Sequence, residues 1–528
     1  MSNTEPAGRP LAVRGATQGI AFLAIALACG AYSIYRGQDA SWDLKNYHYY
    51  VPFASVHGRL MEDVAPAGMQ SFHHPGLDYP FYFLVSHFND HPKVVSFLMA
   101  FPTAVAIALL VLLSLKVAGR EQGRWAPAAF CVLMGVCGAA GISQWGTTTN
   151  EWPLAALAIG ALCVVMRALD RGGLTARDAM IAGLVCGVGA GLKLTAVTAC
   201  VAMAGAFLLL PLPLRERLRA AFTFGLASLA GFAAAAGAWM AGLYESFSNP
   251  LFPYFNSIFQ SPWWAPQEIV TRVFGPKSWS DAILFPLAML KRNSLASEPY
   301  LRDWHLPILY ASGLLFALAL PARRALGATQ APMNAMERFL LTYAGIFYLL
   351  WLAVHSIYRY LIPLELISGC VLLVLWRRTV PWRLWPVFAV VLVVVWATKI
   401  NASWGRVPFG ERFFDVASPA LPAGTLVLIA SDKPLAYVVP GFPRDSRFVG
   451  INNNIIRPGL NTHLNQRAAD VIAGHRGEIF LLDQRGKEQF GALPSYSLRR
   501  SDEPCVELRS NMDSGGLSLC RVLRASMP

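Results

Sequence analysis

The sequence predicts a polytopic α-helical membrane protein with about 11 transmembrane helices, followed by a small extracytoplasmic α/β domain. Three observations lead to this fold class. Hydrophobic residues make up 55% of the 528 residues and charged residues only 14%, which is far more apolar than a typical soluble chain. Apolar segments of roughly membrane-spanning length recur along residues 18–397. From residue 401 the composition becomes that of a soluble chain of about 125 residues, the size of one small domain.

The expected spans follow one another closely. They cover residues 18–35, 94–115, 126–142, 153–166, 179–192, 194–210, 221–243, 306–320, 339–354, 360–375 and 387–397. The stretch 179–210 contains Lys193 and fits either one long interrupted helix or a helical hairpin. The hairpin fits the charge pattern better. We therefore expect a membrane module over residues 1–400 and a periplasmic domain over residues 401–528.

The formal net charge of +13 follows this topology. Arg9 and Arg14 precede the first span, so the positive-inside rule places the amino terminus in the cytoplasm. Alternating sides then makes every later cytoplasmic loop basic, through Lys116, Arg120 and Arg124; Arg167, Arg171 and Arg177; Arg215, Arg217 and Arg219; Arg323, Arg324 and Arg338; and Arg377, Arg378 and Arg383. An odd number of spans puts the C-terminus outside. Basic residues distributed in this way do not indicate a nucleic-acid partner.

The outer connections carry most of the other polar residues. They are the large first loop at 36–93, the segment 143–152, Lys193, the long stretch 244–305 and the turn 355–360. Within them we expect an amphipathic interfacial helix at 46–61 and a second interfacial helix at 283–290. Polar groups from distant parts of the sequence therefore converge on one side of the membrane.

The C-terminal domain shows strand and helix patterns. Residues 425–430 and 478–483 indicate buried strands, with a helical stretch near 466–473 between them. Cys505 and Cys520 end two short strands joined by a turn around residues 513–516, so they could form a disulfide in an oxidising compartment. A pair of free thiols is the alternative.

Several residues are candidates for chemistry. Asp43 follows the first span and Trp42, and a carboxylate at that depth is costly unless it is hydrated, partnered or functional. If Asp43 works as a base near neutral pH, partial desolvation could raise its pKa, and His48 or Lys45 could tune it. Lys193 and Arg359 lie at outer ends of spans, where they either bind a lipid phosphate or simply snorkel to the interface.

A second cluster lies within the first loop. His73, His74 and Asp78 could hold a divalent metal, because imidazole and carboxylate suit zinc or manganese. Their spacing is not a recognised metal motif, and hydrogen bonding within the loop is the favoured interpretation. We therefore predict no certain cofactor and leave a divalent metal open.

The stretch WDLKNYHYYVPFA followed by GR resembles the first periplasmic loop of GT-C-type membrane glycosyltransferases, in which an acidic residue just after the first span is a catalytic hallmark. GTTTNEW resembles the position of the second acidic group of that class and offers Glu151. Three further segments, GAGLKLTAV, SNPLFPYFN and IYRYLIPLE, resemble motifs of uncharacterised bacterial members. The first loop lacks the adjacent acidic pair of some members, and the second lacks a DxD, which leaves metal dependence open.

The resemblance implies transfer of a sugar from a polyprenyl-phosphate donor to a glycolipid or envelope-glycan acceptor, at the outer face of a bacterial inner membrane. Asp43 would be the catalytic base and Glu151 would position the acceptor. The expected substrate-binding residues are His48, Lys45, His74, Asp78, Lys193, Arg359, Asn249 and Asn256.

The main alternative is a transporter or flippase of a lipid-linked or anionic substrate. Such a protein should concentrate ionisable or helix-breaking residues near mid-membrane and often has two related halves. Here the charges gather at outer span ends, and the sequence shows no internal repeat. A non-catalytic scaffold is a third interpretation.

Overall fold

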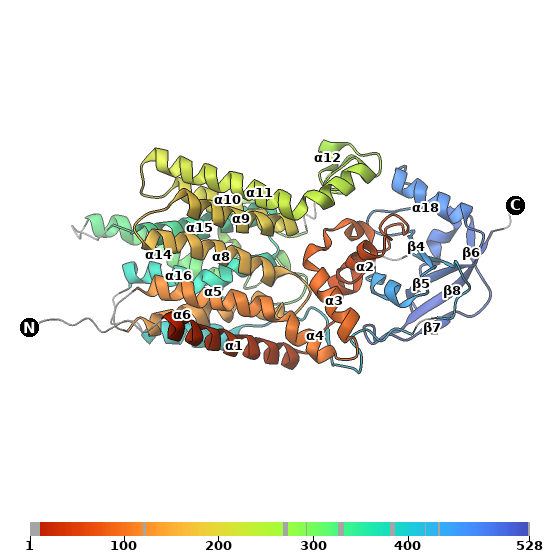
Figure 1. The fold of residues 1–528 in the computed structure, drawn as a ribbon, viewed down its shortest axis with the longest axis horizontal. Helices are drawn as coiled ribbons and strands as arrows, with labels where there is room; N and C mark the ends of the chain where they lie inside the picture. Colours follow the sequence, from red (N-terminus) through yellow and green to blue (C-terminus); the bar gives the residue numbers. More distant parts are fainter. Residues whose placement is uncertain are drawn as a thin grey trace, which may run out of the picture.

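The computed structural model describes residues 11–119, 123–267, 273–291, 293–325, 332–380, 386–417, 419–430 and 433–525. A helical bundle occupies one end of the molecule and a β-sheet with its helix the other, with the short helices of the first loop between them (Figure 1). Of the basic residues that set the expected topology, Arg9, Arg120 and Arg383 lie outside the described residues.

The bundle is built from long apolar helices. They are α1 (Leu11–Arg36), α4 (Pro92–Met99), α5 (Phe101–Ala118), α6 (Trp125–Val136), α8 (Glu151–Asp170), α9 (Ala176–Leu192), α10 (Val197–Leu208), α11 (Leu214–Phe247), α14 (His305–Ala325), α15 (Ala335–Val354), α16 (Ile362–Thr379) and α17 (Pro386–Thr398). Among the described residues, six helical stretches are long and apolar enough to cross a membrane, and four shorter apolar helices accompany them. The chain is thus a helical membrane protein with a small C-terminal sheet, as predicted.

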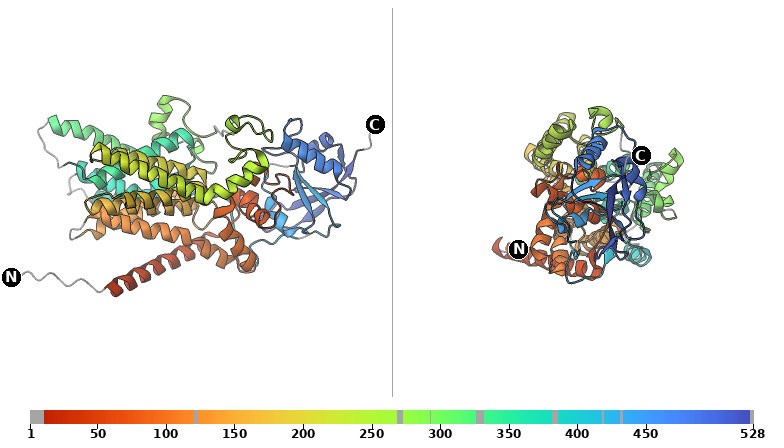
Figure 2. Two further views of the ribbon diagram at one scale, coloured as in Figure 1. Left: turned by 45° about the horizontal axis from the view of Figure 1, so that its top comes forward. Right: turned by 90° about the vertical axis from the view of Figure 1, so that its right-hand side faces the viewer.

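α1 lies along the edge of the bundle in both orientations (Figure 2), whereas α16 lies in its core. The difference shows in burial, because only 17% of the apolar window of α1 is buried and 83% of that of α16. Lys193 stands between α9 and the 3₁₀ turn η4 (Leu194–Ala196), in extended conformation, and α10 follows. The predicted break at this position is therefore confirmed.

α9 and α11 pack closely because glycines remove side chains from their contact. Gly183, Gly187 and Gly191 recur every fourth residue of α9, and a Cβ on Gly187 would lie 2.0 Å from the backbone oxygen of Ser228 on α11. A side chain at any of these three positions would collide with the backbone of α11, which explains why all three are glycines.

Replacing Gly187 with alanine should therefore force α9 and α11 apart. We expect a loss of about 1–3 kcal/mol in the free energy of unfolding, the usual cost of overpacking. The matched control is Gly225→Ala on α11, where an added Cβ meets nothing within 4 Å. Unfolding curves of the purified protein in detergent check this, and equal curves for both variants would contradict the close contact.

The predicted span at 126–142 is wrong in its second half. α6 ends at Val136, and a separate short helix α7 (Ala139–Ser143) follows. The buried carboxylate of Glu365 accepts from the backbone nitrogens of Ala140 and Gly141 at 3.2 and 2.9 Å. Asp303 accepts from that of Ala139 at 2.6 Å. These two acids, distant in sequence, fix the N-terminus of α7 and turn the chain.

The first loop folds into short buried helices. They are the π-helix η1 (Leu44–His48), α2 (Tyr50–Val56), the 3₁₀ turns η2 (Gly68–Phe72) and η3 (Pro75–Leu77), and α3 (Tyr79–Phe88). The amphipathic interfacial helix expected at 46–61 is therefore wrong. Its apolar residues Tyr50 and Val51 are buried against protein, and the helix has ended by Gly58, whose φ is +69°. The expected helix at 283–290 corresponds to α13 (Trp279–Ala288), after the one-turn α12 (Asn256–Phe259).

The C-terminal sheet has the strand order β4-β3-β5-β8-β6, with β7 also paired to β8. Its strands are β3 (Leu426–Ile429), β4 (Arg447–Gly450), β5 (Ile479–Gln484), β6 (Leu498–Arg500), β7 (Val506–Leu508) and β8 (Leu517–Arg524), with α18 (His463–Gly474) beside them. β3 pairs in parallel with β4 and β5, while β8 runs antiparallel to β5. The two predicted strands and the predicted helix are confirmed.

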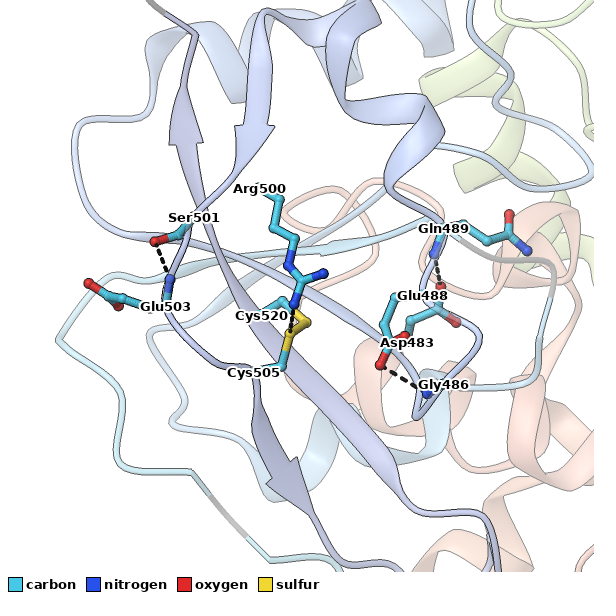
Figure 3. Close-up of a disulfide and its surroundings, with 9 residues drawn as sticks. All are labelled: Asp483, Gly486, Glu488, Gln489, Arg500, Ser501, Glu503, Cys505 and Cys520. Atoms are coloured by element: carbon cyan, nitrogen blue, oxygen red, sulfur yellow. Dashed lines mark hydrogen bonds between the residues drawn. A yellow bond between two sulfur atoms is a disulfide. The ribbon is translucent and has the colours of Figure 1, made fainter.

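A disulfide joins Cys505, just before β7, to Cys520 in β8, with Cα atoms 4.2 Å apart. Figure 3 shows the guanidinium of Arg500 against it, 3.7 Å from the sulfur of Cys505. The disulfide closes the β7–β8 hairpin.

The first loop and the C-terminal sheet share one hydrophobic core. Leu44, Tyr50 and Val51 from the loop pack in the same buried cluster as Leu435 and Tyr437. The loop also begins by pairing in a small sheet, β1 (Gln38–Asp39) with β2 (Arg406–Val407). The described residues between 401 and 525 thus pack continuously with the first loop, 36–93.

A buried ion pair fastens this shared core. Arg59 donates to Asp63 at 2.8 Å and to the carbonyl oxygen of Ser446 at 2.6 Å. Asp63 also accepts from the backbone nitrogen of Phe448 at 3.0 Å and from the hydroxyl of Tyr50 at 3.1 Å. One carboxylate therefore links the first loop to strand β4.

Arg59→Met should leave the Asp63 carboxylate buried without its counter-ion. Breaking a buried pair from one side costs about 3–5 kcal/mol, and we expect a loss of that size in unfolding free energy. Glu62→Gln is the control, because Glu62 is 48% exposed and lies 3.9 Å from Arg59. It should change stability by less than about 1 kcal/mol. Denaturant unfolding in detergent measures both, and similar effects would rule out Arg59 as the fastening residue.

Candidate functional site

Four charged residues from four separate segments meet at the end of the bundle nearest the sheet. Asp43 immediately precedes η1, Glu151 begins α8, Lys193 follows α9, and Arg359 lies in the 3₁₀ turn η6 (Tyr358–Leu361) before α16. Local structure places each of them. Asn150 adopts a left-handed conformation just before α8 starts at Glu151, and the extended backbone of Lys193 ends α9.

The four side chains alternate in charge. Arg359 Nη1 donates to Asp43 Oδ2 at 2.6 Å, and its Nε lies 3.6 Å from Glu151 Oε1. Lys193 Nζ donates to both carboxylate oxygens of Glu151, at 2.9 and 3.1 Å, and to the carbonyl oxygen of Thr149 at 3.0 Å. We call Asp43, Arg359, Glu151 and Lys193 the charge chain.

The charge chain is largely shielded from solvent. The side chains of Arg359 and Asp43 are 13% and 15% exposed, and those of Glu151 and Lys193 are 3% and 21% exposed. Electrostatic interactions are stronger in such a place than in water. Two cations here have two carboxylate partners, so the chain is neutral as it stands.

The pKa of Asp43 is lowered from its ordinary value. Burial raises it, but the positive charges of Arg359, His48 and Lys193 outweigh that effect. The expectation of a raised pKa is therefore wrong, because the sequence did not show that Arg359 would bind this carboxylate directly. Asp43 is ionised at neutral pH and able to accept a proton.

His48 lies beside Asp43 with one free nitrogen. Its Nδ1 is 2.7 Å from Asp78 Oδ1, and Asn150 Nδ2 donates to the same oxygen at 2.5 Å. Its Nε2 is buried with no hydrogen-bond partner among the described residues. The wider turn of a π-helix brings residues five apart toward one face, which explains why His48 acts on the charge of Asp43.

Aromatic rings enclose the charge chain. The guanidinium of Arg359 lies 5.5 Å from the ring centre of Tyr360 and 5.3 Å from that of Trp404. Lys193 Nζ lies 5.5 Å from the ring centre of Tyr360. The ring of Tyr47 packs edge-on against that of His73. Such rings favour cations and also provide flat apolar surfaces.

We call the rings of Tyr47, His73, Tyr254, Tyr360 and Trp404 the aromatic wall. His73 belongs to it as a neutral ring. Its Nε2 is 2.8 Å from the hydroxyl of Tyr254. Burial, with smaller contributions from nearby positive charges, lowers the pKa of His73 to about 3. It therefore carries no charge at neutral pH.

An apolar pocket begins at the charge chain. It is narrow, with about 30 Å³ accessible to a water-sized molecule. Glu151, Arg359 and Tyr360 line one end, and the remaining lining comes from Leu154 and Ala158 of α8, Thr195 of η4, Ala196, Ala199 of α10, Phe347 of α15 and Pro363 of α16. The pocket thus places the guanidinium of Arg359 at an apolar cavity between four helices.

Comparison with known proteins gives a structural likeness. No protein-family model and no curated protein matches the sequence. The structure is similar to that of ArnT from Cupriavidus metallidurans bound to undecaprenyl phosphate, with 16% sequence identity and a TM-score of 0.45. The match covers 71% of this chain and 63% of that chain, so this chain spans less than two thirds of ArnT. At this TM-score and identity the likeness by itself assigns no function.

Other residues predicted from the sequence lie outside the charge chain. Lys45 Nζ donates to the carbonyl oxygen of Met512 at 3.4 Å and therefore faces the C-terminal sheet. His74 accepts from the nitrogen of Gly76 through Nδ1 and bonds the carbonyl oxygen of Ala235 on α11 through Nε2. Both side chains connect the first loop to neighbouring segments.

Asn249 and Asn256 are fully buried and bind their own loop. Asn249 Nδ2 donates to the carbonyl oxygen of Tyr254 and to Asn256 Oδ1. Asn256 Nδ2 donates to three backbone oxygens between residues 261 and 265. Their amides shape the loop that presents Tyr254 to His73.

His73, His74 and Asp78 are engaged in hydrogen bonds, the interpretation that the sequence favoured over a metal site. They bind Tyr254, Ala235 and His48 respectively. Across the part of the chain that the structure describes, no group of three or more His, Cys, Asp or Glu residues could hold a metal ion.

Sequence reasoning missed several residues of the wall. Tyr254 and Tyr360 stand inside motifs that drew attention for other residues, so a signal was present. Trp404 follows the last expected span, in a stretch with no motif, and only the fold brings it to Arg359.

Proposed function

We propose that the protein is a GT-C-type membrane glycosyltransferase that moves a sugar from a polyprenyl-phosphate donor to an extracytoplasmic glycolipid or envelope-glycan acceptor. One observation carries the proposal: Arg359 and Glu151 line an apolar pocket between bundle helices, and they are paired with Asp43 and Lys193 respectively. A lipid phosphate needs this combination of cations for its head and an apolar passage for its chain.

In the proposed topology the eleven helices α1, α5, α6, α8, α9, α10, α11, α14, α15, α16 and α17 cross a bacterial inner membrane. The basic residues near the ends of α5, α8 and α16 face the cytoplasm, as the positive-inside rule requires. The charge chain and the C-terminal sheet are then periplasmic. The disulfide Cys505–Cys520 suits that oxidising compartment.

The donor would bind with its phosphate on Arg359 and Lys193. Arg359 offers several donors in one plane and Lys193 a compact charge. The first part of the lipid chain would lie along Leu154, Ala158 and Phe347. This orientation directs the sugar toward Asp43 and the aromatic wall.

Transfer then requires one proton acceptor and one leaving group. Asp43 takes the proton of the acceptor hydroxyl or amine as that atom bonds to the anomeric carbon of the sugar. The bond from that carbon to the phosphate oxygen breaks, and the electron pair stays on the phosphate. Arg359 and Lys193 stabilise the charge that develops there. Glu151 holds Lys193 in place and helps to position the acceptor.

The test uses the purified full-length protein in lipid nanodiscs with a panel of radiolabelled undecaprenyl-phosphate sugars and cell-envelope extract. We expect label to move from one donor to an extract component and to require the protein. Movement of labelled donor across proteoliposome membranes, without transfer to any acceptor, would contradict the proposal and favour a flippase. The position of the charges at one end of the bundle argues against that alternative.

A further inference from the structure

Each member of the charge chain already has a partner of opposite charge in the absence of substrate. Arg359 is already bound to Asp43 at 2.6 Å and lies 3.6 Å from Glu151, and Lys193 is already bound to Glu151. A phosphate that binds Arg359 must therefore compete with a carboxylate. Of the two acids, Glu151 holds both oxygens against Lys193, whereas the structure shows only Oδ2 of Asp43 in contact with Arg359.

We propose that Arg359 exchanges partners during transfer: it keeps its contact with the Asp43 carboxylate while the donor is bound, and it moves to the phosphate monoester as Asp43 takes the proton of the acceptor, so that Asp43 carries a proton in the product complex. This inference rests on the proposed function and assigns Arg359 the role of a counter-ion that moves with the negative charge. It applies to the complex with the product, undecaprenyl phosphate, because beside the donor Asp43 stays ionised and acts as the base.

The charge balance of the transfer supports the exchange. Before transfer, the Asp43 carboxylate carries one negative charge and the donor phosphodiester one. Afterwards Asp43 is protonated and neutral, and the phosphate monoester carries two. The proton has left the acceptor for Asp43, and the electron pair of the broken carbon–oxygen bond has stayed on the phosphate. One negative charge has thus moved from Asp43 to the phosphate, and Arg359 lies where it can follow.

The surroundings of Asp43 favour its protonation once Arg359 has left. Its carboxylate is 15% exposed, so water replaces the lost partner poorly. The ionisable groups that act on it are Arg359 from η6, His48 and Tyr47 from η1, Lys193 before η4, and His73 between η2 and η3. His48 is held by Asp78 and Lys193 by Glu151, which leaves Arg359 as the partner that a phosphate can remove.

The exchange couples phosphate binding to proton uptake. In the free protein Asp43 is ionised, and in the complex with undecaprenyl phosphate it is protonated over a range of pH that includes neutrality. Linkage then requires affinity for the phosphate to rise as the pH falls, by up to about tenfold per pH unit for one proton. If the phosphate bound beside an unchanged Asp43–Arg359 pair, the pH dependence of its affinity would reflect only the ionisation of the phosphate itself.

The experiment is isothermal titration of the purified protein in detergent with undecaprenyl phosphate, in buffers of different ionisation enthalpy, between pH 6 and pH 8 (about one unit either side of neutrality). The comparison is with Asp43→Asn, which keeps the shape of the side chain and the phosphate's own ionisation. The expected result is one more proton taken up by the wild type than by Asp43→Asn. Glu151→Gln should take up the same number of protons as the wild type, and it serves as a second variant if Asp43→Asn unfolds.

Equal proton uptake by the wild type and Asp43→Asn, with both binding the phosphate, would overturn the exchange and leave the phosphate site intact. If the wild type takes up the extra proton and Glu151→Gln does not, the exchange is overturned as well, because the proton then binds to Glu151. Failure of the wild type to bind undecaprenyl phosphate at any pH would instead overturn the proposed function itself.

Discussion

Replacing Asp43 with asparagine is expected to lower the rate of sugar transfer by about 10²–10⁴-fold, the usual contribution of a positioned general base. Asparagine has nearly the same shape as aspartate but cannot take the proton of the acceptor. The loss should appear in kcat, while the donor still binds, because Arg359 and Lys193 remain and Arg359 no longer has Asp43 as a competing charge. The measurement is the initial rate of label transfer at saturating donor.

Asp63→Asn is not a suitable control, because Asp63 is structural. Asp90 serves instead: it lies on the same loop, and its side chain is 70% exposed beside Arg412. Asp90→Asn should retain wild-type transfer. Equal activity of Asp43→Asn and the wild type would remove Asp43 from the chemistry, provided that both variants unfold at the same temperature as the wild type.

Arg359→Met is expected to reduce kcat/KM for transfer by about 10²–10³-fold, which is the loss typical of removing one donor that stabilises developing charge. Two effects combine. The leaving phosphate loses its best partner, and the Asp43 carboxylate loses the guanidinium that holds it ionised. Lys193→Met should have a smaller effect, because Lys193 contacts Glu151 and not Asp43.

The Arg359 variant should also change the pH profile of kcat/KM. A base works only when it is ionised, so activity is lost as the pH falls through its pKa. In the wild type the pKa of Asp43 is lowered, mainly by Arg359 acting against burial, so activity persists into acid. Without Arg359 that pKa rises, and the acid limb moves to higher pH. Lys93→Gln, an exposed cation on α4, should leave the limb in place; an unmoved limb in Arg359→Met would contradict the ion pair.

Much of the fold follows from local sequence. Apolar length predicts the long helices, and the interruption at Lys193 predicts the break between α9 and α10. Short continuous apolar runs predict the buried strands β3 and β5. These features depend on neighbouring residues alone, and hydropathy reports them directly.

The errors arose where distant residues decide local structure. α6 stops early because Glu365 and Asp303, more than a hundred residues away, bind the backbone of α7. The first loop is buried and not interfacial because the C-terminal segment around Tyr437 covers it. Neither partner leaves a mark in the sequence of the segment that it alters.

The candidate site shows the same division. Asp43, Glu151, Lys193 and Arg359 stand out in the sequence because charge at the end of an apolar span is costly. Their order in the charge chain, and the turn of Lys45 toward Met512, depend on how five segments pack together. The aromatic wall was missed because an aromatic residue is common in apolar segments and signals nothing by itself.

The most direct test of the central claim is a cryo-electron microscopy structure of the protein in nanodiscs with undecaprenyl phosphate. The account predicts the phosphate in hydrogen-bond contact with Arg359 and Lys193, with the lipid chain leaving between α8, α10 and α15 along Leu154 and Phe347. Density for the phosphate at the opposite end of the bundle, near the basic loops, or anywhere else away from Arg359, would contradict it.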